Sequence, residues 1–302
     1  MTRYNCRVST VSSGTLAQAY AACEALARSH YENFPVASRL LPKAMRPHIA
    51  AVYAFARRAD DMADEGDAPA GDRRAALDAW QRSLHAAVES TDVVSGFSRT
   101  DELMLTATAH SIRALDLPLS LFDDLVSAFA QDTTTTRYAS WADVLDYCRR
   151  SANPVGRLVL RIAGHRDAAL DRSSDALCTA LQLTNFWQDF GRDWRAGRLY
   201  VPRVAQVSTN AEESELAAGE MSHAWADAIL YCVAFTREQF SQGRAVCDGV
   251  RGRLRAELRL TWLGGERILD RVASGRFTLL DHRPTLGAAD RPRQASAGGR
   301  AA

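Results

Sequence analysis

Two pairs of aspartates at helical spacing are the residues of this chain best suited to chemistry. Asp60 and Asp64 follow one apolar run, and Asp189 and Asp193 follow another. On a helix, side chains four residues apart lie on one face with Cβ atoms roughly 5–6 Å apart, so the carboxylates of each pair repel one another. The first pair also precedes Gly66, a predicted helix end, where the helix dipole disfavours negative charge. A bound cation would offset both penalties.

The identity of that cation follows from ligand chemistry. Two carboxylate pairs, each after an apolar helix, can face one another across a helical bundle. One or two carboxylate ligands from each of two facing helices suit Mg²⁺, which keeps bound waters and takes further ligands from substrate phosphates. Arginines near both pairs can bind the remaining phosphate oxygens: Arg57, Arg58, Arg192, Arg195 and Arg198. The two pairs together predict a diphosphate bridged by Mg²⁺, whereas either cluster alone would also fit an acidic helix end exposed to solvent.

Other chemistries lack their motifs in this sequence. DMADEGD does not carry the ligand positions of an EF-hand loop, and no histidine pair at helical spacing offers a zinc site. There is no GxGxxG after a strand, no Walker loop and no GxSxG elbow. Chemistry that uses ATP, a nicotinamide cofactor or a serine nucleophile therefore has no sequence support.

Composition limits the partners. The formal net charge is +1, which offers no argument for a nucleic-acid partner. The six cysteines form no CxxC pair and are predicted to be free thiols in a reducing cytoplasm. The first residues lack the apolar stretch of a signal peptide, and no segment approaches about 18 consecutive apolar residues. We expect a cytoplasmic protein, for which peripheral contact with a membrane surface stays open.

The elements that position the aspartates are predicted to be helices, so the expected fold class is all-α. The segments between prolines are rich in Ala, Leu and Arg and poor in alternating β-branched runs. We expect one domain over residues 1–280 and a disordered tail over residues 281–302, which is rich in Gly, Pro, Ala and Arg. The predicted helices are 15–29, 43–65, 71–90, 100–115, 119–131, 140–152, 154–164, 171–192, 219–249 and 252–275.

The stretches YAFARRADDMADE and QLTNFWQDFGRDWRAGRLYVP resemble the two aspartate-rich motifs of the squalene/phytoene synthase family, the head-to-head prenyl synthases. The similarity in order and spacing extends over about residues 25–275. The resemblance implies an isoprenoid-synthase bundle with a deep apolar cavity that takes Mg²⁺ and an isoprenoid diphosphate. It assigns the metal to four residues: Asp60, Asp64, Asp189 and Asp193.

The resemblance also implies roles for other side chains. Tyr53 and Arg57 lie on the face of the first aspartates, and YCRRSANPVG matches a family helix that places Tyr147 at the reaction centre and Gly156 at a helix contact. For Tyr53 and Tyr147, packing in the core is the alternative. The implied substrate-binding residues are Asn33, Phe34, Arg57, Gln182, Asn185, Arg198 and Tyr200.

Departures from the family pattern favour one branch. Asn33 stands at a common serine, Ser151 and Asn153 fall where the family has VAG, and Gln188 replaces a common arginine. These stretches look like the branch called hydroxysqualene synthase, found in bacterial hopanoid pathways. That branch implies conversion of presqualene diphosphate and water to hydroxysqualene without NADPH. The four polar residues are candidates to hold the water, although Asn153 could instead cap a helix and Ser151 could bond its own backbone.

Two other functions remain open from the sequence. One is a condensing synthase that makes presqualene diphosphate, squalene or phytoene from farnesyl or geranylgeranyl diphosphate. The other is a non-catalytic helical partner protein of a membrane isoprenoid pathway. The intact carboxylate pairs disfavour the second, because a protein without catalysis has no need for their repulsion. The sequence does not define an oligomeric state.

Overall fold

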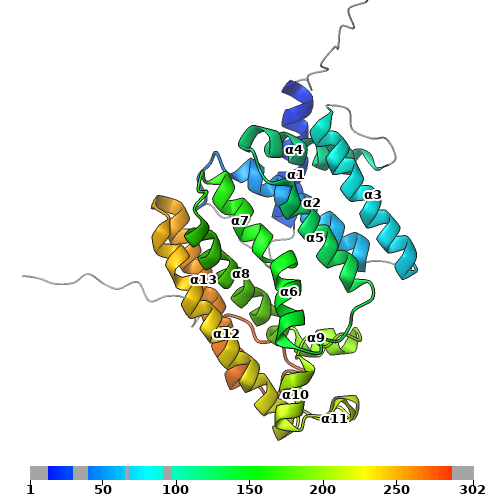
Figure 1. The fold of residues 1–302 in the computed structure, drawn as a ribbon, viewed down its shortest axis with the longest axis vertical. Helices are drawn as coiled ribbons and strands as arrows, with labels where there is room; N and C mark the ends of the chain where they lie inside the picture. Colours follow the sequence, from blue (N-terminus) through cyan, green and yellow to red (C-terminus); the bar gives the residue numbers. More distant parts are fainter. Residues whose placement is uncertain (1–12, 30–39, 65–67, 91–96, 288–302) are drawn as a thin grey trace, which may run out of the picture.

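The computed structural model describes residues 13–29, 40–64, 68–90 and 97–287. Every regular element in these ranges is a helix, and the helices form one bundle (Figure 1). The prediction of an all-α fold is confirmed. The helices are α1 (Ser13–Ser29), α2 (Arg46–Asp64), α3 (Ala70–Glu89), α4 (Arg99–Leu115), α5 (Leu119–Asp132), α6 (Trp141–Ser151), α7 (Asn153–Ile162), α8 (Ala168–Gln188), α9 (Phe190–Arg195), α10 (Arg203–Thr209), α11 (Glu213–Ala217), α12 (His223–Gly249) and α13 (Gly252–Ser274).

Local sequence explains where several helices begin. Ser98 caps α4 by accepting a hydrogen bond from the Asp101 amide, and Ser140 forms a capping box with Asp143 at the start of α6. Pro118 precedes α5, where its missing amide hydrogen costs nothing. These caps satisfy amide groups that a helix end leaves without partners.

The predicted helices match α1 to α7, α12 and α13 within a few residues, but the expected helix 171–192 is wrong in one respect. The backbone departs from helical geometry at Asp189, which separates α8 from α9. The short helices α10 and α11 lie in a stretch for which no helix was predicted.

Helix α8 lies inside the bundle, between α6 and α7 on one side and α12 and α13 on the other (Figure 1). It packs most closely on α12 at Gly243, where a Cβ atom would lie 2.6 Å from the Leu177 amide nitrogen. Gly156 of α7 likewise lies against α8, since a Cβ atom there would come within 2.5 Å of Cys178 Sγ. The implied helix contact at Gly156 is confirmed.

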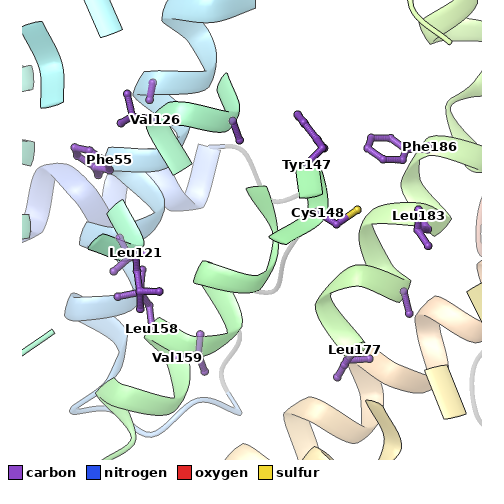
Figure 2. Close-up of a cluster of buried hydrophobic side chains, with 14 of the residues drawn as sticks. Phe55, Leu121, Val126, Tyr147, Cys148, Leu158, Val159, Leu177, Leu183 and Phe186 are labelled. Carbon is purple, nitrogen blue, oxygen red and sulfur yellow. The ribbon is translucent and has the colours of Figure 1, made fainter. Parts of the chain in front are cut away.

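Buried apolar side chains fill the bundle on both sides of α6 (Figure 2). Phe55 of α2 stacks on Trp80 of α3, and Leu158 of α7 is completely buried. The cysteines in the described ranges are free, as the sequence predicted, and Cys6 lies outside those ranges. Among the described helices, none is long and apolar enough to cross a membrane.

The segment after α13 turns back across the junction of α8 and α9. Leu279 and Leu280 are buried there, and a Cβ atom at Gly191 would come within 2.5 Å of the Leu279 carbonyl oxygen. The structure describes this segment as far as Gly287, so the start of the predicted disordered tail at Asp281 has defined contacts. Residues 288–302 lie outside the described ranges.

Candidate active site

All four aspartates of the two pairs line one cavity of about 690 Å³. Asp60 and Asp64 come from the last turns of α2, and Asp189 and Asp193 come from the junction of α8 and α9. The cavity is in the usual size range for a small-molecule site. The two carboxylate pairs therefore face a common space from different sides of the bundle, as their spacing predicted.

The break at Asp189 leaves the second pair intact. The Asp189 amide donates to the Asn185 carbonyl at 2.8 Å, and the Asp193 amide donates to the Asp189 carbonyl at 2.9 Å. Helical hydrogen bonds thus continue across the junction, and Asp189 and Asp193 still stand one turn apart.

The electrostatics of the aspartates favour a bound cation. Burial raises the pKa of Asp60 to about 6, and the neighbouring charge of Asp64 adds to the rise. Burial also raises the pKa of Asp193 to about 7, with the charge of Asp189 as the second cause. Asp60 and Asp193, one from each pair, thus carry negative charges that burial disfavours, and such hard oxygen donors suit Mg²⁺.

Two arginines contact the carboxylates of the first pair. Arg57 Nη1 lies 3.3 Å from Asp60 Oδ2, and Arg198 pairs with both oxygens of Asp64 through its two terminal nitrogens, with Nη1–Oδ2 at 3.0 Å. Guanidinium groups bind carboxylates and phosphates in the same bidentate geometry. These side chains could therefore exchange a carboxylate for a phosphate oxygen.

A third arginine reaches the site from the segment after α13. Arg283 forms an ion pair with Asp189, and Arg195 Nη1 donates to the Leu280 carbonyl at 2.6 Å, which fastens the segment to α9. Sequence reasoning missed Arg283 because the composition of its surroundings favours disorder. Within the described ranges, no three His, Cys, Asp or Glu side chains form a ready metal cluster.

Aromatic rings form the wall of the cavity beside the aspartates. Phe186 of α8 stacks on Tyr200 with ring centroids 3.7 Å apart, and Tyr147 of α6 lies 5.9 Å from Phe186. Figure 2 shows the side chains of Tyr147 and Phe186 next to one another, between α6 and α8. All three rings line the cavity, where their faces can stabilise a cation.

Asp132, at the end of α5, is a site residue that sequence reasoning missed. Its Oδ2 accepts a hydrogen bond of 2.7 Å from the Tyr147 hydroxyl, and the residue lines the cavity. Burial raises the pKa of Asp132 to about 7, and the Tyr147 hydrogen bond opposes the rise. Like Asp60, Asp132 ends an apolar helical run, but it has no second carboxylate four residues away that would mark it.

The opposite end of the cavity is apolar. Its walls come from α2, α7 and α8 and offer mostly hydrocarbon to a ligand. The apolar lining residues include Ile49, Val52, Leu158, Val159, Ile162 and Leu181. The cavity thus combines one charged end with a hydrocarbon body, which suits a long apolar chain that carries a diphosphate.

Comparison with known proteins identifies the family of this chain. Residues 27–290 match the model of the family described as squalene/phytoene synthase. The chain belongs to this family. It is 40% identical over 187 residues to a hydroxysqualene synthase from Zymomonas mobilis, an alignment that covers 61% of this chain and 59% of that protein. A hydroxysqualene synthase from Rhodopseudomonas palustris is 32% identical over 243 residues, which cover 79% of this chain and 78% of that protein.

Other members of the family match as well. A phytoene synthase from Mycobacterium tuberculosis is 34% identical over 186 residues, which span 62% of this chain and 58% of that one. The crystal structure of squalene synthase HpnC from Alicyclobacillus acidocaldarius has a TM-score of 0.79 and 37% identity, over 88% of this chain and 97% of that chain. A dehydrosqualene synthase structure, with TM-score 0.78 and 20% identity, covers 92% and 94% and supports the fold alone.

Most side chains that the family resemblance singled out line the cavity. These are Tyr53, Arg57, Asp60, Asp64, Tyr147, Gln182, Asn185, Asp189, Asp193, Arg198 and Tyr200. Asn33 and Phe34 lie outside the residues that the structure describes. The structure therefore brings these eleven side chains to one place.

Two of the proposed water-binding residues, Asn153 and Gln188, do not line the cavity. Gln188 directly precedes Asp189, so it points to another side of α8, where its Nε2 donates to the Pro284 carbonyl at 2.6 Å. Asn153, the first residue of α7, accepts a hydrogen bond from Thr179 Oγ1 at 3.0 Å. Ser151 is different, since it does line the cavity. Of the polar residues that depart from the family pattern, Asn153 and Gln188 therefore lie outside the cavity, and Ser151 lies in its wall.

Proposed function

We propose that this protein converts presqualene diphosphate and water to hydroxysqualene and diphosphate with Mg²⁺, and without NADPH. The observation that carries the proposal is the single cavity, which has four aspartates at one end, an aromatic wall beside them and a hydrocarbon body. Hydroxysqualene synthases among the relatives support this choice within the family.

The charged end would bind the diphosphate. Asp60, Asp64, Asp189 and Asp193 would hold Mg²⁺, which supplies charge neutralisation for the leaving group. Arg57 and Arg198 flank these aspartates and would donate to phosphate oxygens. Gln182 and Asn185, which line the cavity on α8 before the second pair, add polar groups beside the diphosphate.

The hydrocarbon body would govern the fate of the cation after the diphosphate departs. Loss of the diphosphate leaves a cyclopropylcarbinyl cation, which rearranges to an allylic cation that water captures. The rings of Tyr147, Phe186 and Tyr200 face this region and would stabilise the cation through their π faces. Apolar walls limit water to the few positions that polar side chains offer, which keeps capture selective.

The direct test is product identification. Purified protein would be incubated with Mg²⁺ and presqualene diphosphate without NADPH, with farnesyl and geranylgeranyl diphosphate in parallel, and the lipids identified by mass spectrometry. Hydroxysqualene from the first substrate alone is the expected result, and EDTA should abolish it. A condensed product from either parallel incubation would instead identify a condensing synthase, the second candidate, which the similarity to phytoene synthases favours.

We also propose peripheral contact with an anionic membrane through α13. Leu260 and Leu263 are exposed on its outer face among the exposed arginines Arg253 and Arg267, while Thr261 of the same helix lines the cavity. Arginine and leucine on one face suit an anionic lipid surface. The double substitution Leu260→Ser and Leu263→Ser should reduce sedimentation with phosphatidylglycerol vesicles. Unchanged sedimentation would remove α13 as the contact.

A further inference from the structure

Two polar atoms of the cavity wall have no hydrogen-bond partner among the described residues. They are Oδ1 of Asp132 and the hydroxyl oxygen of Ser151, and both atoms are buried. Both residues line the cavity, Asp132 from α5 and Ser151 from α6. A buried polar atom without a partner costs about 1–3 kcal/mol, so such atoms usually serve a ligand or an ordered water.

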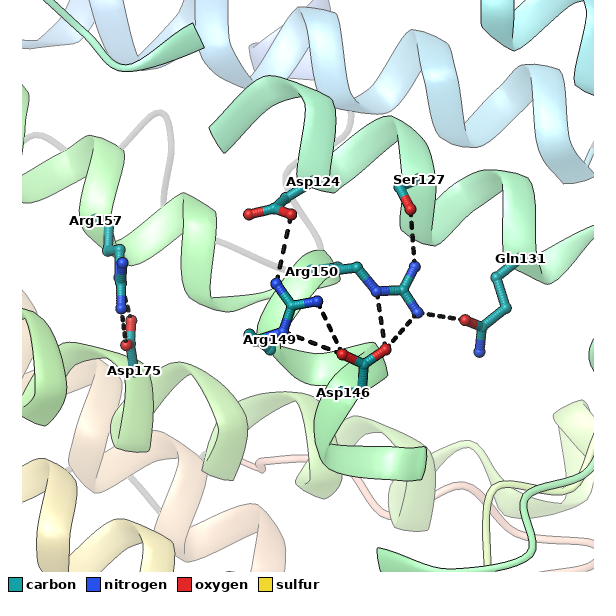
Figure 3. A network of polar contacts seen from close by, with 8 residues as sticks. All are labelled: Asp124, Ser127, Gln131, Asp146, Arg149, Arg150, Arg157 and Asp175. Carbon is teal, nitrogen blue, oxygen red and sulfur yellow. Dashed lines mark hydrogen bonds and ion pairs between the residues drawn. The ribbon is translucent and has the colours of Figure 1, made fainter. Parts of the chain in front are cut away.

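The two residues are held in place by a network on the outer side of the same helices (Figure 3). Arg150 of α6 donates to Gln131 of α5, and it also binds Asp146 Oδ2 at 2.8 Å and Ser127 Oγ at 3.0 Å. Gln131 and Arg150 are the chain neighbours of Asp132 and Ser151. The network therefore fastens the end of α5 to the end of α6 where the two unpartnered atoms enter the cavity.

Tyr147 adds a second constraint on Asp132. Its hydroxyl donates to Oδ2, and burial raises the pKa of Tyr147, so this hydroxyl keeps its proton and remains the donor. One carboxylate oxygen of Asp132 is thereby occupied and the other stays available. Ser151 follows Tyr147 by one helical turn and so lies on the same face of α6.

We propose that Asp132 and Ser151 bind the water that captures the carbocation, and that Asp132 accepts its proton. The water oxygen forms a bond to the cationic carbon, one O–H bond breaks, and the proton passes to Asp132 Oδ1. The products are a neutral alcohol and a protonated carboxyl group. Asp132 is then a catalytic residue, Ser151 a second ligand of the water, and Tyr147 a positioning residue for the carboxylate.

This inference rests on the proposed function, and the measurement separates the two. The ratio of hydroxysqualene to released diphosphate would be determined from presqualene diphosphate for the wild type and for Asp132→Asn, Ser151→Ala and Asp124→Asn. Asp124 is an aspartate of α5 outside the cavity lining and serves as the matched control. If the wild type makes no hydroxysqualene, the proposed function fails. If it does, the variants test the water site alone.

The expected result is a lower ratio in both site variants, with hydrocarbon from loss of a proton replacing the alcohol. General-base catalysis contributes about a hundredfold or more, so Asp132→Asn should lower the alcohol-to-diphosphate ratio by at least about tenfold. Asp124→Asn should leave the ratio unchanged. A wild-type ratio in Asp132→Asn would overturn the proposal. If that variant releases no diphosphate at all, Ser151→Ala decides: a lower ratio supports the water site and an unchanged ratio overturns it.

Discussion

Replacing Asp193 by Asn should stabilise the metal-free protein while abolishing its activity. Burial and the charge of Asp189 raise the pKa of Asp193 from 3.8 to about 7, so the folded protein binds this proton more tightly than the unfolded chain does. Folding stability therefore falls as the pH rises from about 4 to about 7, and the full penalty is present at pH 8. Asparagine resembles the protonated carboxyl group and removes the penalty.

The size of the effect follows from the shift. About three pKa units correspond to about 4 kcal/mol as an upper limit. Because Asp193 is only partly buried, solvent screening reduces this to about 1–2 kcal/mol. For a domain of this size, that gain corresponds to a rise of about 2–4 °C in the melting temperature at pH 8. The gain should shrink by more than half at pH 5, because the folded wild-type protein is then protonated at Asp193.

The assay is thermal unfolding in EDTA at pH 8 and pH 5, followed by circular dichroism. Asp171→Asn is the control of opposite sign, because the ion pair with Arg161 lowers the pKa of Asp171. That variant should lose about 1–3 kcal/mol of folding stability at pH 8. The loss should be the same at pH 5, because it diminishes only below pH 3.8. Excess Mg²⁺ with diphosphate should then stabilise the wild type and not Asp193→Asn. A metal-free Asp193→Asn protein that melts below the wild type at pH 8 would refute the reasoning.

Three further substitutions test other parts of the site. Asp60→Asn should lower turnover at least about a hundredfold with an unchanged helical circular dichroism spectrum, whereas near-normal turnover would remove Asp60 from the metal site. Arg198→Lys should raise KM for the diphosphate substrate about tenfold, since lysine cannot form the two-pronged contact that Arg198 makes with Asp64, and an unchanged KM would exclude this role. Gly191→Ala should lower the free energy of unfolding by about 1–3 kcal/mol, because the added Cβ atom would collide with the Leu279 and Leu280 carbonyls. By contrast, Gly264→Ala, which meets nothing within 4 Å, should be neutral or stabilising in the same melting experiment.

The sequence predicted the fold and much of the site because both depend on helical periodicity. Spacing of four residues placed Asp60 beside Asp64 and Asp189 beside Asp193, and the apolar runs before them placed both pairs in the interior. The second pair survived an unpredicted helix break, since hydrogen bonds from Asn185 to Asp193 cross it. Periodicity within one helix therefore predicts which residues share a face even where the helix ends are wrong.

The sequence could not predict which side chains from different helices contact one another in the cavity. Asp132 has no carboxylate one turn away, and only the packing of α5 on α6 brings it to Tyr147. Arg283 lies in a stretch whose composition favours disorder, yet it reaches Asp189 because Leu279 and Leu280 anchor the chain beside it. Gln188 was predicted to lie near the cavity because it replaces an arginine common in the family. Adjacent residues of a helix point about 100° apart, however, and its side chain bonds the Pro284 carbonyl on another side of α8.

The most direct test of the account is to let the protein act on presqualene diphosphate with Mg²⁺ in water enriched in oxygen-18, and to locate the label. Ionisation followed by water capture breaks the bond between carbon and the diphosphate oxygen. The account therefore predicts one labelled oxygen in hydroxysqualene and none in the released diphosphate. Label in the diphosphate with none in the alcohol would mean hydrolysis at phosphorus, and it would contradict a carbocation held in the aromatic and aspartate-lined cavity.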